Sequence, residues 1–322
     1  MKPNILVSGG FGLLGKPLVD KLIIQNYNVF VLERKVTDRF RFLNFKPKKI
    51  IRGNFLNKKF LMKILLKNKI NVVFHLASIT QVRESLKNPL ETYKVNINGT
   101  INFLETIRDI NPKIIFIYSS SDKAYGELTG RKFYKETDPI QSIYPYDVSK
   151  TVSDMICQSY SKTYNLKVGI IRSGNVYGPG DFNLKRLIPQ LIISTINKKT
   201  FEIRSNGKST RDYIYVSDAV NAYLMLMNKL LNSSKNLRIY NVSSKYNYSV
   251  EKVINKILNK MNSLDLKIKI KNFSKQELQF RRLNYSKISK ELKWKPKIDI
   301  DIGLTKTINW YKKNFKIITK YK

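Results

Sequence analysis

The segment YPYDVSK contains a tyrosine and a lysine, Tyr146 and Lys150, four residues apart at the expected start of a helix. Side chains with this spacing lie on one face of a helix, which brings the ammonium group close to the phenol. The positive charge lowers the pKa of the tyrosine because it favours the phenolate, and a phenolate can accept a proton from an alcohol. The pair is therefore a candidate catalytic base for chemistry at a hydroxyl group.

The same spacing occurs a second time, in YNYSVEKVINKI, at Tyr248 and Lys252. We interpret this second pair as a helix start without chemistry. Only Tyr146 follows a serine-ended apolar strand, IFIYSSSDKAYG, in the half of the chain where strands and helices alternate. Ser121, at the end of that strand, could hold the alcohol or the phenol by a hydrogen bond, although a serine at a strand end also commonly forms a turn.

A glycine-rich turn in VSGGFGLLGKPLVDKL joins the first expected strand to the first expected helix. Its spacing is G-x-x-G-x-x-G, formed by Gly9, Gly12 and Gly15. Glycines there permit a tight turn and let backbone N–H groups approach a phosphate, and the N-terminus of the following helix favours the anion. The turn, with Leu13 and Leu14, is therefore predicted to bind the pyrophosphate of a dinucleotide cofactor.

A carboxylate, Glu33, ends the second expected strand, where it would accept hydrogen bonds from an adenosine ribose. A 2′-phosphate would be repelled at that position, which favours NAD over NADP. Arg34 and Lys35 follow directly and could reverse this preference, or they could be ordinary surface charges.

Short apolar runs alternate with segments of helical periodicity through the first half of the chain. The runs cover residues 5–7, 29–32, 72–74 and 114–117, and the longest amphipathic segments cover 89–110 and 146–164. Such alternation predicts right-handed βαβ units around a parallel sheet. The sequence therefore predicts an α/β fold, a Rossmann-type doubly wound parallel sheet with a smaller, discontinuous substrate-binding domain.

The regular alternation of apolar runs and helical segments ends after Arg172, where the turn-rich segment GNVYGPGDFN begins. The segments VSDAVNAYLML and IYNVSS then resemble a return to the sheet. We therefore predict a cofactor-binding domain of residues 1–172 and 213–243, and a substrate-binding domain of residues 173–212 and 244–322.

The composition of the 322 residues is that of a globular protein, with 42% hydrophobic and 11% aromatic residues, but the formal net charge is +37. Such an excess of positive charge would attract polyanions. The lysines are spread over nearly every segment, with no basic arm and no zinc-finger pattern, so we interpret them as a solvated surface. A nucleic-acid-binding protein without enzymatic activity remains an alternative, and steep salt-dependent RNA binding would indicate it.

Cysteine usage and the hydropathy pattern indicate a cellular location. The one cysteine, Cys157, cannot form an internal disulfide, which fits a reducing compartment. The first residues lead into a strand and a glycine turn rather than a signal peptide, and no apolar run has the length of a membrane span. We therefore expect a cytoplasmic protein without a membrane segment. The one histidine, His75, is interpreted as a packed residue at a strand end.

Together these features resemble the extended short-chain dehydrogenase/reductase family, in its nucleotide-sugar epimerase/dehydratase group. The resemblance covers nearly the whole chain. The further segments that carry it are VVFHLASITQVRESLKNPLETYKVNINGTINFLE, RSGNVYGPGDFNLKRLIP, RDYIYVSDAVNAYL and SKISKELKWKPKIDIDIGLTKTINWYKKN. It implies NAD as the cofactor, a nucleotide-sugar substrate, and a homodimer that pairs the helices predicted at 89–110 and 146–164.

The resemblance also implies positions for binding residues. Those implied for the substrate are Asn175 and Arg211 at its diphosphate, and Arg186 and Leu187 beside its base. Those implied near NAD are Ala77, Asn96 and Asn54. In the family an acidic residue after the third strand receives the adenine, so the asparagine at 54 departs from the family pattern.

An acid and a base, Asp122 and Lys123, directly follow Ser121. In epimerases of the family these two positions are usually small or hydroxylated, whereas the sequence SDK resembles the signature of CDP-glucose 4,6-dehydratases. A dehydratase needs an acid to protonate the departing hydroxyl, a role implied for Asp122, and a base to remove the proton beside the new ketone. Lys123 would assist that removal or stabilise the enolate.

Two alternatives to a catalytic role of Asp122 and Lys123 remain at this point. A nucleotide-sugar 4-epimerase would use Ser121, Tyr146 and Lys150 but would have no use for Asp122. The Asp-Lys pair could also be a surface turn with an incidental ion pair.

Overall fold

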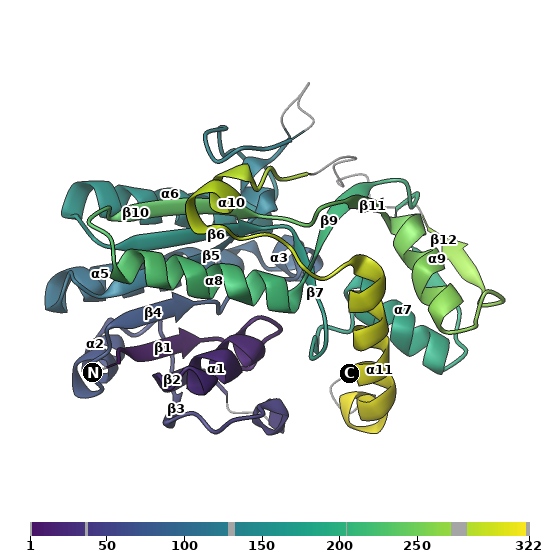
Figure 1. Cartoon of the computed structure of the whole chain (residues 1–322), viewed down its shortest axis with the longest axis horizontal. Helices are drawn as coiled ribbons and strands as arrows, with labels where there is room; N and C mark the ends of the chain where they lie inside the picture. The colour runs from purple at the N-terminus through teal and green to yellow at the C-terminus, as the bar shows by residue number, and fades with distance from the viewer. Residues whose placement is uncertain (1, 36–37, 128–132, 204, 272–281, 320–322) are drawn as a thin grey trace.

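A seven-stranded parallel sheet organises the larger part of the chain (Figure 1). The computed structural model describes residues 2–35, 38–127, 133–203, 205–271 and 282–319. The strands, all parallel to their neighbours, follow the order β10-β6-β5-β4-β1-β2-β3. They are β1 Asn4–Ser8, β2 Asn28–Glu33, β3 Lys49–Arg52, β4 Val72–His75, β5 Ile115–Ser121, β6 Val168–Ser173 and β10 Leu237–Val242. The predicted Rossmann-type α/β fold is confirmed.

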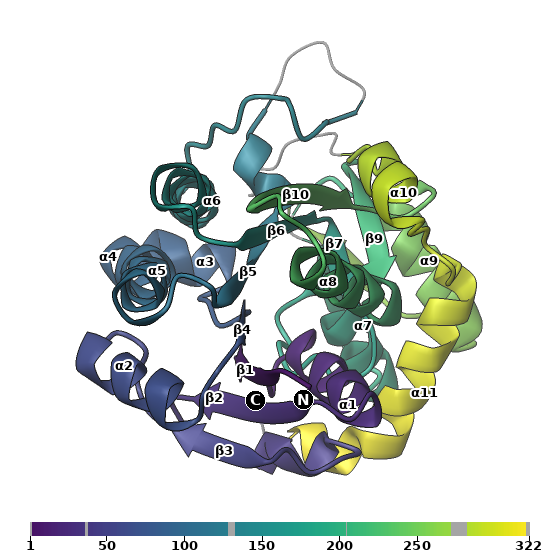
Figure 2. The ribbon, with the colours of Figure 1, turned by 60° about the vertical axis from the view of Figure 1, so that its left-hand side comes forward.

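Helices cover both faces of this sheet (Figure 2). One face carries α2 Lys58–Lys67, α3 Val82–Lys87, α4 Pro89–Tyr93, α5 Gly99–Ile110 and α6 Pro145–Tyr164, and the other carries α1 Gly15–Ile24, α8 Val216–Leu231 and α10 Ser286–Leu292. Successive residues of a strand point to opposite faces, so Ile5 and Val7 belong to one hydrophobic core and Leu6 to the other. This double burial explains why the strands read as continuous apolar runs.

The segment predicted as one helix over 89–110 is continuous in the structure. Between α4 and α5 the chain widens into a π-helical turn, Lys94–Asn98. Such turns often occur at functional sites, and this one carries Asn96. None of the helices within the described residues is long and apolar enough to cross a membrane.

A smaller unit lies beyond the carboxyl ends of the parallel strands, at the right of Figure 1. Its strands are β7 Asn175–Tyr177, β8 Phe201–Ile203, β9 Thr210–Tyr215, β11 Asn247–Ser249 and β12 Ile268–Ile270, and its helices are α7 Leu187–Ile196, α9 Val250–Lys260 and α11 Ile300–Ile318. Strands pair in the orders β11-β9-β7 and β12-β8. The boundary predicted after Asp212 falls within β9, and α10 packs against β10 of the large sheet. The predicted division into two domains therefore stays a prediction.

Candidate active site

A cavity of about 1200 Å³ lies where the carboxyl ends of the parallel strands face the smaller unit. Ligands of doubly wound sheets bind at this edge, where the strand order changes direction, here between β1 and β4. The predicted site residues that line the cavity are Gly9, Gly12, Leu13, Leu14, Gly15, Glu33, Ala77, Ser121, Lys123, Tyr146, Lys150, Asn175, Arg186, Leu187 and Arg211. Those outside its lining are Asn54, Asn96 and Asp122.

The glycine turn after β1 is packed so closely that Gly9 and Gly15 have no room for a side chain. Gly9 has a φ of +75°, and a Cβ atom added there would lie 2.9 Å from the backbone nitrogen of Ala77. A Cβ atom added to Gly15, the first residue of α1, would lie 2.1 Å from the carbonyl oxygen of Gly9. Backbone therefore forms the cavity wall at the N-terminus of α1, as a bound pyrophosphate requires.

The Glu33 carboxylate at the end of β2 also lines the cavity. Its Oε1 accepts a hydrogen bond of 2.9 Å from the backbone N–H of Phe11 in the glycine turn. Burial raises the pKa of Glu33, while the Phe11 N–H and the charge of Arg39 act in the opposite direction. Arg34 lies 3.9 Å from Glu91 of α4 in an exposed ion pair. The glycine turn and Glu33 together fit the pyrophosphate and ribose of NAD.

Two asparagines predicted near the cofactor make other contacts in the structure. The side chain of Asn54 accepts a hydrogen bond from the backbone of Leu56 and forms a local turn. Asn96, in the π-helical turn, bonds to both the backbone N–H and the C=O of Ile79, at 2.8 and 3.1 Å, and donates to Ser149 on α6. Asn96 thus fixes the segment after β4 against α6, and a contact of either residue with NAD stays a prediction.

Tyr146 and Lys150 lie on the first two turns of α6, and both are buried beside the cavity. Lys150 Nζ donates to the carbonyl oxygen of Ser119 at 2.8 Å and to Ser78 Oγ at 3.3 Å. Burial lowers the pKa of Lys150 to about 8. Burial also raises the pKa of Tyr146 well above its usual value, while the Arg186 guanidinium is the main charge that lowers it.

Residues 121–125, which we call the Ser121 turn, comprise the last residue of β5 and the short 3-10 helix Asp122–Tyr125 that follows it. Ser121 Oγ accepts from the backbone N–H of Lys123 at 3.2 Å and donates to Asp122 Oδ1 at 2.9 Å. Ser121 also acts on Tyr146, because its hydroxyl group lowers the pKa of the phenol. Asp122 is buried behind the cavity wall, whereas Lys123 lines the cavity, with its Nζ 3.6 Å from Asp147 Oδ1 on α6.

The residues implied for the substrate lie on the opposite wall, in the smaller unit. Asn175 begins β7, and Arg211 lies on β9. Arg186, just before α7, donates to Asp181 Oδ2 at 3.0 Å and to Thr80 Oγ1, in the segment after β4, at 3.2 Å. One guanidinium group therefore connects the two walls of the cavity.

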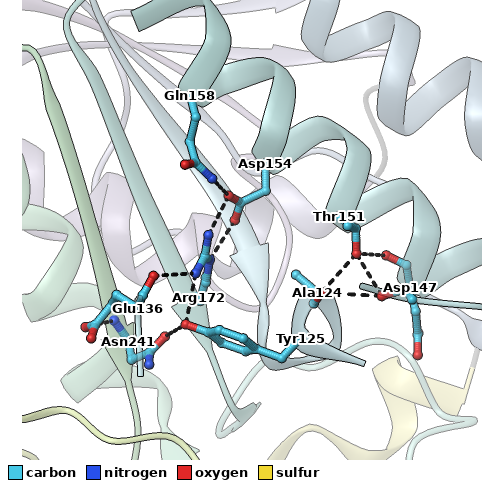
Figure 3. A network of polar contacts seen from close by, with 10 residues as sticks. Ala124, Tyr125, Glu136, Asp147, Thr151, Asp154, Gln158, Arg172 and Asn241 are labelled. Atoms are coloured by element: carbon cyan, nitrogen blue, oxygen red, sulfur yellow. Dashed lines mark hydrogen bonds and ion pairs between the residues drawn. The ribbon is translucent and has the colours of Figure 1, made fainter. Parts of the chain in front are cut away.

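Sequence reasoning missed a buried ion pair behind the Ser121 turn (Figure 3). Arg172 near the end of β6 is 1% exposed and forms two hydrogen bonds with Asp154 of α6. A charged residue within the apolar strand VGIIRS is the sequence signal that could have indicated it.

A second buried carboxyl group that the sequence did not indicate is Asp212, next to Arg211 on β9. Its Oδ2 accepts hydrogen bonds from Ser243 Oγ at 2.8 Å and from the backbone N–H of Leu283 at 2.7 Å. Burial raises the pKa of Asp212 to about 7, so that this carboxyl group titrates near neutral pH.

His75 is packed at the end of β4, as expected. It is 1% exposed, its Nδ1 lies 2.8 Å from Ser8 Oγ, and its ring centroid lies 4.7 Å from that of Phe103. Burial lowers the pKa of His75 to about 3. In the described part of the chain, no group of three His, Cys, Asp or Glu side chains is arranged to hold a metal ion.

Comparison with known proteins identifies relatives along almost the whole chain. Residues 5–243 match the family described as "NAD dependent epimerase/dehydratase family". A candidate UDP-glucose 4-epimerase of Methanocaldococcus jannaschii is 31% identical, over 96% of this chain and 99% of that protein. A dTDP-D-glucose 4,6-dehydratase of Dictyostelium discoideum is 29% identical, over 97% of this chain and 82% of that protein.

Solved structures show the same fold. A UDP-glucose 4-epimerase of Thermotoga maritima, solved with UDP-glucose, has a TM-score of 0.89 at 28% identity and covers 97% of this chain and 99% of its own. A dTDP-glucose 4,6-dehydratase of Streptomyces venezuelae, solved with NAD, has a TM-score of 0.91 at 22% identity and covers 99% of this chain and 100% of its own.

Proposed function

Because the chain belongs to the NAD-dependent epimerase/dehydratase family of nucleotide-sugar enzymes, with NAD as its cofactor, we propose that it is a nucleotide-sugar 4,6-dehydratase. The observation that carries the proposal is the Ser121 turn. It sets Asp122 and Lys123 beside the Tyr146 helix and places Lys123 in the cavity wall. A 4-epimerase has no step that requires this acid and this base.

The first step is oxidation at C4 of the sugar, and it depends on α6. Tyr146, as phenolate, accepts the proton of the C4 hydroxyl. The Arg186 guanidinium and the Ser121 hydroxyl favour the phenolate, and Lys150, held by Ser119 and Ser78, lies one helical turn from Tyr146. When bound, NAD supplies a reversible acceptor for the C4 hydride.

The second step is loss of water across C5 and C6, and it depends on the Ser121 turn. The C4 ketone acidifies the C5 proton, whose removal is assisted by Lys123, and the C6 hydroxyl leaves as water with a proton from Asp122. Asp122 lies behind the cavity wall, with its Oδ1 2.9 Å from Ser121 Oγ. In this step the carboxyl group of Asp122 would be protonated: Ser121 passes its own proton to the leaving hydroxyl and takes the proton of Asp122 in its place. The hydride then returns to C6 and a proton to C5, which gives a 4-keto-6-deoxy sugar.

The proposal also concerns which nucleotide the sugar substrate carries. The SDK sequence of the Ser121 turn resembles CDP-glucose 4,6-dehydratases, which makes CDP-glucose our first candidate. The relatives reported above are named for dTDP-glucose and UDP-glucose. A panel of CDP-, dTDP-, UDP- and GDP-glucose, followed by mass for loss of water, distinguishes these substrates.

A 4-epimerase is the second candidate. The M. jannaschii relative, at 31% identity, favours it, and so does the position of Asp122 outside the cavity lining. Such an enzyme would return the hydride to C4 with inverted configuration and without loss of water.

The deciding experiment uses a substrate deuterated at C4. We expect a product lighter by one water with deuterium on its C6 methyl group, from an enzyme that needs no added reductant. In Asp122→Asn, elimination should slow by roughly 10²- to 10⁴-fold, while C4 oxidation continues and reduced cofactor accumulates, visible by its absorbance. Asp138→Asn, the same change at a buried aspartate outside the cavity lining, is the control. Deuterium that returns to C4 without loss of water would establish the epimerase.

We also propose that the protein is a homodimer. Apolar side chains are exposed on the helices that the family resemblance pairs: Leu90 of α4 is 79% exposed, and Met155 and Tyr164 of α6 are 54% and 47% exposed. Burial of this surface in a partner would remove it from water. Light scattering at micromolar concentration should give twice the chain mass, and a monomeric mass would contradict the proposal.

A further inference from the structure

Arg172 is placed so that one guanidinium group contacts both parts of the proposed catalytic machinery (Figure 3). Its Nε and Nη2 donate to the two carboxylate oxygens of Asp154, each at 2.9 Å. Asp154 lies one helical turn after Lys150 on α6. This bidentate ion pair fixes the orientation of the two side chains as well as their distance, because planar guanidinium and carboxylate groups can pair in few geometries.

The third nitrogen of the same group contacts the Ser121 turn. Arg172 Nη1 donates to Tyr125 Oη at 3.0 Å, and the guanidinium carbon lies 4.9 Å from the centroid of the Tyr125 ring. Tyr125 in turn donates to Asn241 Oδ1 of β10 at 2.7 Å. Tyr125 is the last residue of the 3-10 helix that Asp122 begins, so the end of the turn is tied to the sheet and to α6.

A second set of hydrogen bonds attaches the backbone of the turn to α6. Thr151 Oγ1, next to Lys150, donates to the carbonyl oxygen of Ala124 at 3.1 Å. Ser142 Oγ lies 2.7 Å from Thr151 Oγ1 and donates to the carbonyl oxygen of Lys123 at 2.9 Å. The turn therefore has two attachments to the helix, one through its side chain at Tyr125 and one through its carbonyl groups.

The chemistry of the network indicates a role in geometry rather than in stability. Removing two charges from water is unfavourable, and apolar residues of similar volume often stabilise a protein equally well. Asp154 and Arg172 are nevertheless fully buried, at 0% and 1% exposure. Burial lowers the pKa of Lys150, and the negative charge of Asp154 raises it. The carboxylate that binds Arg172 therefore also acts on Lys150.

We propose that Arg172 and Tyr125 are positioning residues that set the Ser121 turn against the Tyr146 helix, with Asp154 as their anchor on that helix, and that Tyr125 serves the elimination step more than the oxidation step. The inference rests on the proposed dehydratase function. It predicts that loss of the Tyr125 hydroxyl slows elimination more than C4 oxidation, because this hydroxyl holds the turn without contacting Tyr146 or Lys150.

Tyr125→Phe tests this inference, since it keeps the ring and removes only the hydroxyl that Arg172 and Asn241 contact. In single-turnover experiments with the C4-deuterated substrate, we expect C4 oxidation within about twofold of wild type and elimination slowed by roughly 10- to 100-fold, the scale of a small misplacement of reacting groups. Reduced cofactor should therefore accumulate in the variant. Thr151→Val, which removes the second attachment, should change the ratio of the two rates in the same direction.

Tyr240→Phe is the matched control. Tyr240 is a buried tyrosine on β10 whose hydroxyl bonds to Glu291 and Arg238, away from the Ser121 turn. Its loss should leave the ratio of elimination to oxidation unchanged. An equal fall of both rates in Tyr125→Phe, or no change in their ratio, would overturn the inference while wild type still dehydrates. If wild type loses no water at all, the proposed function fails and the inference fails with it.

Discussion

Two segments of the chain share the spacing Tyr-x-x-x-Lys, and the structure treats them differently. Tyr146 and Lys150 both belong to α6, are both buried, and both line the cavity. Tyr248 lies on strand β11, is half-buried, and precedes α9, whereas Lys252 is exposed on that helix. Neither Tyr248 nor Lys252 lines the cavity. The second pair was predicted to lack chemistry but also to begin a helix, and Tyr248 instead belongs to a strand.

The position of the helix start explains the difference. Pro145 is the first residue of α6, so Tyr146 lies in the first turn and shares a face with Lys150. In α9 the capping residue is Ser249, whose Oγ accepts from the backbone N–H of Lys252 at 3.1 Å, so Tyr248 lies before the helix. A four-residue spacing therefore indicates a catalytic pair only if the helix begins before the tyrosine.

The largest expected effect is on turnover, and it should differ between variants of Tyr146 and Tyr248. Tyr146→Phe removes the proposed proton acceptor and should lower turnover by roughly 10² to 10⁴ with nucleotide-sugar binding retained. Tyr248→Phe should leave turnover within about twofold, since surface changes away from a site have small effects. Comparable losses in the two variants would show that the spacing, and not its setting, determines the chemistry.

Lys150 and Lys252 should differ in their effect on the pH dependence of C4 oxidation. The pKa of Lys150, lowered to about 8 by burial, means that its ammonium form is lost as the pH rises through 8. The rate of C4 oxidation should therefore decrease above pH 8 in wild type. Lys150→Met should lower the rate by roughly 10²-fold and abolish this decrease, and Lys252→Met should retain both the rate and the decrease. A wild-type profile that is flat across pH 8 would contradict the role of Lys150.

The smallest expected effect is on stability, and it concerns Ser249, which caps α9 in the second Tyr-x-x-x-Lys segment. Ser249→Ala removes the cap of α9 and should lower the free energy of unfolding by about 0.5 to 2 kcal/mol, measured by denaturant titration. Turnover should not change, because the cap contacts only the helix backbone. Lost turnover at unchanged stability would mean that this segment takes part in the reaction.

Local patterns account for what the sequence predicted. Apolar runs identified the strands, and the Gly9 to Gly15 spacing identified a turn that the structure places in the cavity wall. Such signals depend on residues that are neighbours along the chain. The bond from Tyr125 to Asn241 joins residues 116 apart, and that from Arg186 to Thr80 joins residues 106 apart. No local pattern reports such pairs, because they exist only once distant elements have packed together.

The position of Asn96 illustrates the same limit inside a correctly predicted helix. The helix over 89–110 was expected from its periodicity, but the π-helical turn that directs Asn96 toward Ile79 and Ser149 was not. A residue inserted into a helical turn rotates every side chain that follows it, so periodicity alone cannot assign the neighbours of Asn96.

The hydrophobic core on the α1 and α8 face of the sheet does not stop at the edge of the sheet. Val220 of α8, Ile192 of α7 and Leu304 of α11 belong to the same cluster of buried side chains. The two walls of the cavity therefore share one dry interior, and separating them would expose it to water. It follows that the parallel sheet and the smaller unit stabilise each other, because a fragment that lacked either would expose apolar side chains of the other to water.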